Sequence, residues 1–202
     1  MSIAVVDYKA GNLTSVCNAL THIGADHFVS SDPDKLRLGD RLIFPGVGHA
    51  KSAMARLKET GIADMLTSYA NSGKAMLGIC LGSQVLLDHS EEGDTDTLGI
   101  ILGQVKLFSP SIGLKIPHIG WNQVYPAGNP HPLFKDIPDG SSFYFVHSYY
   151  TAVADASNTL CTTDYGGTFC SGVRQGNVCA VQFHPEKSGK WGLKMLENFS
   201  RM

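Results

Sequence analysis

Residues 75–87 decide the fold, and they read A-M-L-G-I-C-L-G-S-Q-V-L-L. An apolar run leads into Gly78-Ile79-Cys80-Leu81-Gly82, and a second apolar run follows it. This pattern predicts a buried strand that turns sharply and continues as a helix over residues 81–88. Glycines suit the flanks of such a turn, because side chains there would collide and the central residue takes strained torsions. The turn is a nucleophile elbow that carries sulfur in place of oxygen.

The helix after the turn would direct its free N–H groups and the positive end of its dipole at Cys80. That field favours the thiolate, which is the reactive form of cysteine. The pentapeptide alone fits equally well a buried cysteine at a strand end between two loop glycines. The choice between a nucleophile and a packing residue therefore depends on the rest of the chain.

The first half of the chain alternates apolar strands with amphipathic helices. Strands are expected at residues 3–7, 27–29, 41–44 and 75–79, and helices at 13–23, 53–57, 62–69 and 81–88. Apolar strands separated by helices predict a parallel sheet that is covered on both faces.

The second half is dominated by short strands separated by turn residues. Strands are expected at residues 103–108, 123–125, 142–146, 149–153, 160–163, 169–174 and 178–183. An amphipathic helix closes the chain at 191–199, with Ser188 as a candidate cap, and residues 91–96 read as a solvated acidic loop. The expected fold is one α/β domain over residues 1–202. It has a mixed, mostly parallel central sheet with helices on both faces, and antiparallel strands in the C-terminal half.

Composition narrows the classes of partner. The 202 residues are 43% hydrophobic and 17% charged, with a formal net charge of −2 and no basic run, so a nucleic-acid partner is not indicated. No apolar segment approaches the roughly 20 residues that span a bilayer, and the first residues lack a basic leader. Five widely spaced cysteines argue against a disulfide framework and a zinc site, and favour a reducing cytoplasmic location.

A cysteine nucleophile needs a base to take its proton and a third group to orient that base. His184 is the strongest candidate, because it ends an apolar strand and Pro185 restricts it to extended torsions. Glu186 lies two residues further on, where its carboxylate can turn back to the imidazole. His147 is the rival base, but it lacks an adjacent carboxylate, and we interpret it as structural or site-lining. The histidines interpreted as surface residues are His22, His27, His49, His89 and His131.

Acyl attack also requires an oxyanion hole, because negative charge develops on the carbonyl oxygen. One donor should be the backbone N–H of Leu81, the residue after the nucleophile. A second is expected from the segment Pro45-Gly46-Val47-Gly48, with Gly48 as its candidate residue, because glycines allow close approach and a peptide flip. Alone, this segment would be an ordinary Gly-Pro loop.

These motifs together resemble the class I, triad-type glutamine amidotransferases. The elbow with Gln84 matches their pattern G-x-C-x-G-x-Q, and His184-Pro185-Glu186 matches their H-P-E. The resemblance covers essentially the whole chain. Within the family, the resemblance narrows to the glutaminase subunits of imidazole glycerol phosphate synthase. The segments that follow the pattern of these subunits are residues 7–13, 45–48, 117–122, 144–149 and 184–188.

The resemblance implies that Cys80, His184 and Glu186 form a triad that hydrolyses glutamine to glutamate and ammonia. It implies that Gln84 binds the α-amino or α-carboxylate end of the substrate. Ammonia would pass through a channel into a separate (β/α)8-barrel cyclase subunit, in a heterodimer of histidine biosynthesis. No metal or organic cofactor is implied.

The resemblance also assigns a set of residues to a rim or gate that faces the partner: Asn12, Pro117, His118, Ile119, Trp121, Tyr144 and Lys187. Two positions depart from the family pattern. Lys9 replaces the usual glycine of the first loop, and Ser83 stands where methionine or histidine is commoner. We expect the isolated chain to be nearly inactive, with a carbonyl of the segment 45–48 facing the oxyanion site until the partner docks.

Other functions fit part of the pattern. The elbow and H-P-E also occur in the glutaminase components of anthranilate synthase and of guanylate-forming (GMP synthase) amidotransferases. A non-enzymatic module on the same fold would be free to lose Cys80, His184 or Glu186. A redox-sensing cysteine would need a resolving thiol nearby.

Overall fold

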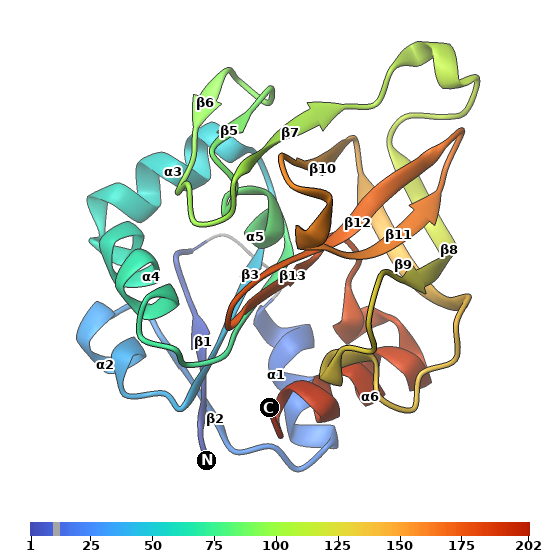
Figure 1. Ribbon diagram of the computed structural model, residues 1–202. Helices are drawn as coiled ribbons and strands as arrows, with labels where there is room; N and C mark the ends of the chain where they lie inside the picture. The colour runs from blue at the N-terminus through green and yellow to red at the C-terminus, as the bar shows by residue number, and fades with distance from the viewer. Residues whose placement is uncertain (10–12) are drawn as a thin grey trace.

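A computed structural model describes residues 1–9 and 13–202 of the chain. Its main sheet has the strand order β2-β1-β3-β4-β13-β12-β10-β7-β5-β6, with β11, β8 and β9 joined to it beyond β12 (Figure 1). The strands are β1 (Ile3–Val6), β2 (His27–Ser30), β3 (Arg41–Gly46), β4 (Met76–Cys80), β5 (His89–Ser90), β6 (Thr95–Asp96), β7 (Gly103–Leu107), β8 (His118–Pro126), β9 (Ser141–His147), β10 (Tyr149–Val153), β11 (Thr159–Asp164), β12 (Thr168–Gln175) and β13 (Val178–Val181). The α-helices are α1 (Leu13–His22), α2 (Pro33–Arg37), α3 (Ala50–Glu59), α4 (Ile62–Ala70), α5 (Leu81–Gln84) and α6 (Gly189–Phe199).

Strands β2, β1, β3, β4 and β13 are parallel to one another and lie between two layers of helices. Alternate side chains of each strand enter opposite cores: Ile3 packs in the core that contains α1 and α6, whereas Ala4 packs in the core that contains α2, α3 and α4. Figure 1 shows α1 and α6 on one side of these strands and α2–α4 on the other. Burial on both faces explains why the inner strands β1, β4 and β13 are apolar throughout.

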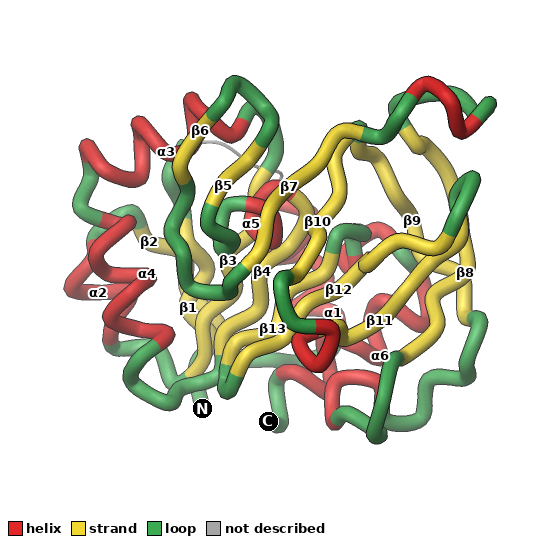
Figure 2. The backbone as a smooth tube through the Cα atoms, turned by 45° about the horizontal axis from the view of Figure 1, so that its top comes forward, coloured by secondary structure: helices red, strands yellow, loops and turns green. Residues whose placement is uncertain are grey.

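The rest of the sheet is largely antiparallel. Strand β12 pairs antiparallel with β13, β10 and β11, and β8 and β9 form a long antiparallel ribbon. Figure 2 shows the parallel strands continuing into this second part of the sheet, with the ribbon at its far side. The expected fold class, a mixed α/β sheet with helices on both faces and antiparallel strands in the C-terminal half, is confirmed.

Several elements differ from the expectation. Helix α5 ends at Gln84 instead of residue 88, because the chain from Leu98 to Ile101 folds back and donates backbone hydrogen bonds to the carbonyls of Val85 and Leu86. Strand β8 is longer than predicted, and the short hairpin β5–β6 replaces part of the expected acidic loop. The sequence reading missed α2, although Asp32 caps it and Pro33 occupies its first turn.

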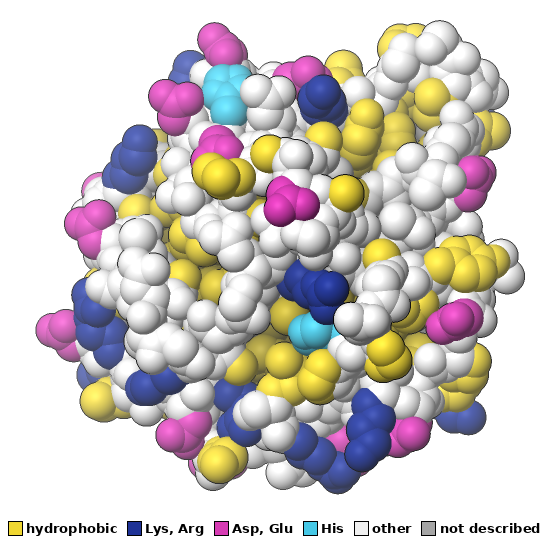
Figure 3. Space-filling view, in the orientation of Figure 1, with side chains coloured by type: hydrophobic (Ala, Val, Ile, Leu, Met, Phe, Trp, Pro, Cys, Tyr) yellow, Lys and Arg dark blue, Asp and Glu magenta, His cyan; other side chains and the backbone are white. Residues whose placement is uncertain are grey.

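The chain has 16 Lys and Arg residues and 18 Asp and Glu residues, so neither sign of charge dominates. Acidic and basic side chains are interspersed on the face drawn in Figure 3. Among the described residues, no helix is both long and apolar enough to cross a membrane.

Candidate active site

The elbow forms where β4 meets α5. Cys80 has φ 56° and ψ −114°, a strained conformation for a residue with a side chain. A Cβ on Gly82 would lie 2.0 Å from the carbonyl oxygen of Phe44, and one on Gly78 would lie 2.9 Å from the carbonyl oxygen of Gly82. Both glycines are therefore required by close backbone contacts, as the sequence pattern predicted.

The order of the strands brings the motif His184-Pro185-Glu186 to this turn. Strands β4 and β13 are parallel neighbours, with Ile79 paired to Val181, so Cys80 ends one strand beside the residues that end the other. The two strand ends border a cavity of about 370 Å³, at the lower end of the range for small-molecule sites. It is lined by Val47, Gly48, Cys80, Leu81, Gln84, Glu92, Pro117, Val146, His147, Ser148, Tyr149 and His184.

His184 and Glu186 form a buried pair behind the cavity. Nδ1 of His184 lies 2.7 Å from Oε1 of Glu186, and each side chain is 2% exposed. Because a carboxylate accepts, Nδ1 carries the hydrogen, and Nε2 has no hydrogen-bond partner among the described residues. Burial opposes the charged imidazole, but the interactions of His184 with the nearby sulfur of Cys80 and the carboxylate of Glu186 outweigh it and raise the pKa of His184 to about 9. The arrangement can hold a proton beside the sulfur and release it.

Two further contacts hold the backbone of His184. Its N–H donates to the carbonyl of Tyr144 at 2.9 Å, and its carbonyl accepts from Oγ of Ser188 at 2.6 Å. The same Oγ accepts the N–H of Tyr144 at 3.0 Å. Ser188 occupies the cap position of α6 but makes no capping hydrogen bond, so the expected role as a helix cap is wrong. Its side chain instead joins the end of β13 to β9.

His147 lies in the cavity wall and pairs with His118. Its Nδ1 lies 2.7 Å from the carbonyl of Tyr149, which can only accept, so Nε2 must accept from Nδ1–H of His118 at 2.9 Å. Burial lowers the pKa of His147 to about 3 and that of His118 to about 4. This pair is neutral at physiological pH, and its hydrogen-bond pattern agrees with the interpretation of His147 as site-lining.

The expectation that His118 faces a partner is wrong. His118 is only 3% exposed, because the two-residue period of β8 turns it to the inner face, next to Phe145. The neighbouring Ile119 and Trp121 are each 59% exposed and point to the outer face.

The other described rim residues are exposed or, in the case of Tyr144, half-buried. Trp121 is paired with Tyr144 across the β8–β9 ribbon, with ring centroids 6.1 Å apart. Pro117 is exposed and lines the cavity, and Lys187 is exposed just after the H-P-E motif. Asn12 lies outside the described residues. The outer face of the ribbon is thus an apolar surface next to the cavity, and its role in docking stays a prediction.

The two candidate oxyanion donors border the same cavity. Leu81 begins α5 directly after Cys80, and Gly48, which also lines the cavity, has φ 103°, in the region that glycine favours. Val47, between Gly46 and Gly48, is 37% exposed. The structure therefore brings both segments to the sulfur, while their function as an oxyanion hole stays a prediction.

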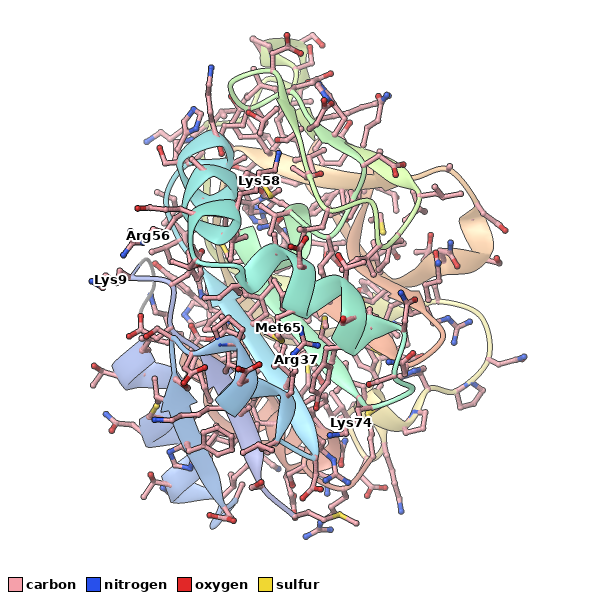
Figure 4. All side chains as sticks on the ribbon, turned by 90° about the vertical axis from the view of Figure 1, so that its left-hand side faces the viewer. Lys9, Arg37, Arg56, Lys58, Met65 and Lys74 are labelled. Carbon is pink, nitrogen blue, oxygen red and sulfur yellow. The ribbon has the colours of Figure 1, made fainter. Side chains whose placement is uncertain are left out.

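The first loop keeps a glycine-like conformation at the position where Lys9 departs from the family. Lys9 has φ 61°, and its N–H donates to Oδ1 of Asp7 at 2.8 Å. Lys9 and Arg56 project from the same side of the molecule and line a separate cavity of about 290 Å³ behind Val47 and Gly48 (Figure 4). The substitution thus preserves the backbone and adds a positive charge to this side.

Gln84 is buried beside the cavity, but its amide group is already engaged. Its Nε2 donates to the carbonyl of Tyr149 at 3.0 Å and to Oε1 of Gln182 at 2.8 Å. Both amide hydrogens are therefore used inside the protein, and its carbonyl oxygen is the part left for a substrate. The predicted contact between Gln84 and substrate would have to be made by that oxygen.

Three residues of the site were missed by sequence reasoning. Gln182 reaches the sulfur of Cys80 through Nε2 at 3.7 Å, and Tyr149 supplies the carbonyl that holds Gln84. Glu92 lines the cavity and accepts the N–H of Ala50 at 2.6 Å, although its acidic segment read as a solvated loop. Only Gln182 had a sequence signal, as a polar residue inside an apolar strand.

The remaining thiols lie away from this cavity. All five cysteines are free, and burial raises the pKa of Cys17, Cys161, Cys170 and Cys179. Among residues 1–9 and 13–202, no group of three or more His, Cys, Asp or Glu side chains is arranged to hold a metal ion.

The chain is similar to known proteins over nearly its full length. The family model for class I glutamine amidotransferases matches residues 4–202. The chain is 46% identical to imidazole glycerol phosphate synthase subunit HisH of Dehalococcoides mccartyi (strain CBDB1), over 99% of this chain and 97% of that protein. It is 49% identical to the protein of the same name from Methanosarcina barkeri, over 99% and 98% of the two chains. Among solved structures, that of PurLQS from Thermotoga maritima covers 98% of this chain and 96% of its own, with a TM-score of 0.76 and 22% identity, a likeness in fold. The chain therefore belongs to the class I glutamine amidotransferases, a family of enzymes.

Proposed function

We propose that this chain is the glutaminase subunit of an imidazole glycerol phosphate synthase, acting as one domain over residues 1–202. The observation that carries the proposal is the buried His184–Glu186 pair placed beside a strained cysteine at the edge of one cavity. The names and near full-length identity of the relatives support the choice of synthase.

The proposed chemistry uses the three side chains in turn. The sulfur of Cys80 attacks the side-chain amide carbon of glutamine, and His184 holds the thiol proton. His184 then gives that proton to the departing nitrogen, the C–N bond breaks, and ammonia leaves a glutamyl thioester. Water attacks the thioester, His184 takes a proton from the water and returns it to sulfur, and glutamate is released. Glu186 fixes the tautomer of His184 and stabilises the imidazolium.

The oxyanion would be stabilised by backbone donors at Leu81 and at the 45–48 segment. The glycine conformation at Gly48 and the exposure of Val47 support a segment that can change its peptide orientation. We infer that this segment completes the oxyanion hole only when a partner docks, so the isolated chain has little activity.

The proposed partner is a (β/α)8-barrel cyclase subunit that receives ammonia through a channel, in a cytoplasmic heterodimer of histidine biosynthesis. The exposed Ile119 and Trp121, with the half-buried Tyr144 and exposed Lys187, support a docking surface beside the cavity mouth. Aromatic side chains of this kind are typical anchors of interfaces. The cytoplasmic location is a further prediction, which cell fractionation tests.

A coupled assay with the cyclase subunit and its nucleotide substrate tests the proposal. With glutamine as nitrogen donor, wild type should turn over and Cys80→Ala should lose activity. With an added ammonium salt, both should turn over. Loss of both activities in Cys80→Ala would mean that the cysteine supports the structure, and equal glutamine hydrolysis with and without cyclase would refute the gated oxyanion hole.

The alternative is the glutaminase component of another synthase, such as anthranilate or GMP synthase. The elbow and H-P-E do not distinguish these enzymes, and the fold likeness to other amidotransferases does not either. The Gly120-Trp121-Asn122 segment and Lys187-Ser188 favour the first proposal. Activity with another synthase subunit, and none with the cyclase, would establish the alternative.

A further inference from the structure

Helix α5 is shorter than the helix that was expected to favour the thiolate of Cys80. The sequence predicted a helix over residues 81–88 whose dipole would favour the thiolate of Cys80, but α5 has 4 residues. A macrodipole needs several aligned peptide units, so one turn supplies only part of the expected field. Polar side chains beside the sulfur therefore matter more for the stability of a thiolate than the helix alone.

The side chain of Gln182 reaches the sulfur of Cys80. It is 1% exposed, and its Nε2 lies 3.7 Å from Sγ of Cys80, within hydrogen-bonding reach for sulfur. Gln182 follows β13 directly, and the pairing of Val181 with Ile79 sets its position beside Cys80. Its own N–H donates to the carbonyl of Ser171 at 2.9 Å, which anchors it to β12.

A chain of hydrogen bonds determines which end of the amide faces the sulfur. The carbonyl of Tyr149 can only accept, so the atom of Gln84 that faces it is nitrogen. The second hydrogen of that nitrogen goes to Gln182, whose bonded atom must therefore be Oε1, at 2.8 Å. Nε2 of Gln182 is left to point at Cys80, and a backbone carbonyl thus orients two buried amides.

We propose that Gln182 donates a hydrogen bond to the sulfur of Cys80 that stabilises the thiolate before substrate binds, and that Gln84 and Tyr149 are positioning residues that keep this donor turned toward the sulfur. A donor that favours the charged form shifts the thiol–thiolate equilibrium toward thiolate. This proposal rests on the proposed function, because a preformed thiolate is useful to a chain in which Cys80 attacks glutamine.

Other titratable groups also face Cys80. His184 follows β13, Tyr8 follows β1, and Glu92 and His147 line the same cavity from the β5–β6 turn and β9. A test must therefore change Gln182 while leaving these groups in place. Gln182→Met keeps the length of the side chain and removes the donor, and Gln182→Glu keeps its shape and replaces the donor by an anionic acceptor.

The experiment measures the rate of Cys80 alkylation by iodoacetamide against pH, with peptide mass spectrometry separating Cys80 from the other four thiols. It is done on the full chain without glutamine or partner, so it reads the thiolate whether or not the chain hydrolyses glutamine. Gln104→Met, on an exposed position of β7, is the matched control. Circular dichroism and thermal unfolding show whether each variant is folded.

We expect Gln182→Met to move the midpoint of the profile to higher pH and to slow alkylation at pH 7 about three- to tenfold. Gln182→Glu should move it further, because a carboxylate repels the thiolate, and Gln104→Met should match wild type. A folded Gln182→Met or Gln182→Glu variant with the wild-type profile would overturn the proposal. If Gln182→Met does not fold, the Glu variant decides. Glutamine turnover is measured separately on the wild-type complex with the cyclase subunit. If that complex turns over glutamine but Gln182→Met has the wild-type alkylation profile, only the Gln182 proposal is refuted. If the profile shifts but the complex does not turn over glutamine, only the proposed function is refuted.

Discussion

At the scale of single residues, the site depends on hydrogen bonds whose direction is fixed. The carboxylate of Glu186 orients His184, and the carbonyl of Tyr149 orients Gln84 and, through it, Gln182. In each case an atom that can only accept sets the polarity of its neighbours. The groups closest to Cys80 are thereby arranged before any ligand enters.

The substitution Glu186→Gln leaves the base His184 in place and tests what the carboxylate that orients it contributes. The amide can still contact Nδ1 of His184, but the negative charge is lost, so the pKa of His184 should fall from about 9 toward its ordinary value. Glutamine-dependent kcat in the complex should fall by about 10²- to 10⁴-fold. NMR titration of the ring and steady-state kinetics measure the two effects. Glu59→Gln, an exposed carboxylate on α3, is the control, and an unchanged pKa of His184 in Glu186→Gln would contradict this assignment.

At the scale of elements, the elbow is built from contacts between backbones. The sequence predicted the strand, the turn and the two required glycines, because these follow from local sterics at Gly78, Cys80 and Gly82. It did not predict where α5 ends, because the carbonyls of Val85 and Leu86 are bonded to a segment more than ten residues away. Nor could it predict the Gln84–Gln182 contact, which depends on β4 and β13 being neighbours.

Gly82→Ala tests the elbow as an element. Its Cβ would lie 2.0 Å from the carbonyl oxygen of Phe44, so β3 and α5 must separate, and we expect a loss of about 3 kcal/mol or more in the free energy of unfolding. Gly73→Ala is the matched control. It has φ 79° and no atom near the added Cβ, so only backbone strain of about 1–2 kcal/mol applies. Urea unfolding measures both, and equal losses would contradict the steric account.

At the scale of the whole molecule, strand order gathers residues from both halves of the chain. The parallel strands predicted from the first half and the antiparallel strands of the second half meet at β13, which carries His184 to the elbow. The catalytic candidates Cys80, His184 and Glu186 were recognisable from motifs. The inner position of His118 was not, because it depends on the register of the β8–β9 ribbon, which pairs it with His147.

The buried histidine pair predicts how stability depends on pH. Burial lowers the pKa of His118 to about 4 and that of His147 to about 3, so between pH 6.5 and 4 the unfolded chain binds more protons than the folded one. This contribution to stability is complete above pH 6.5 and is lost as pH falls, by up to about 1.4 kcal/mol per pH unit for each histidine. His184, whose pKa is raised, contributes stability that is lost only as pH rises from 6.5 toward 9.

Urea unfolding at pH 7 and pH 5 tests this prediction with His147→Gln, because glutamine can still donate to Tyr149 and accept from His118. Between pH 7 and pH 5, the free energy of unfolding should fall less in the variant than in wild type. The difference should be about the contribution of one histidine. The same loss in both proteins would show that His147 does not titrate as its burial requires.

The central claim is that Cys80 and His184 act together on the amide of glutamine, and covalent trapping tests it most directly. The chain, in complex with the cyclase subunit, is treated with an electrophilic diazoketone analogue of glutamine and mapped by mass spectrometry. One adduct on the peptide that contains Cys80, strongly reduced in His184→Asn, is the predicted result. An adduct on another residue, or the same rate of Cys80 labelling without the imidazole, would contradict it.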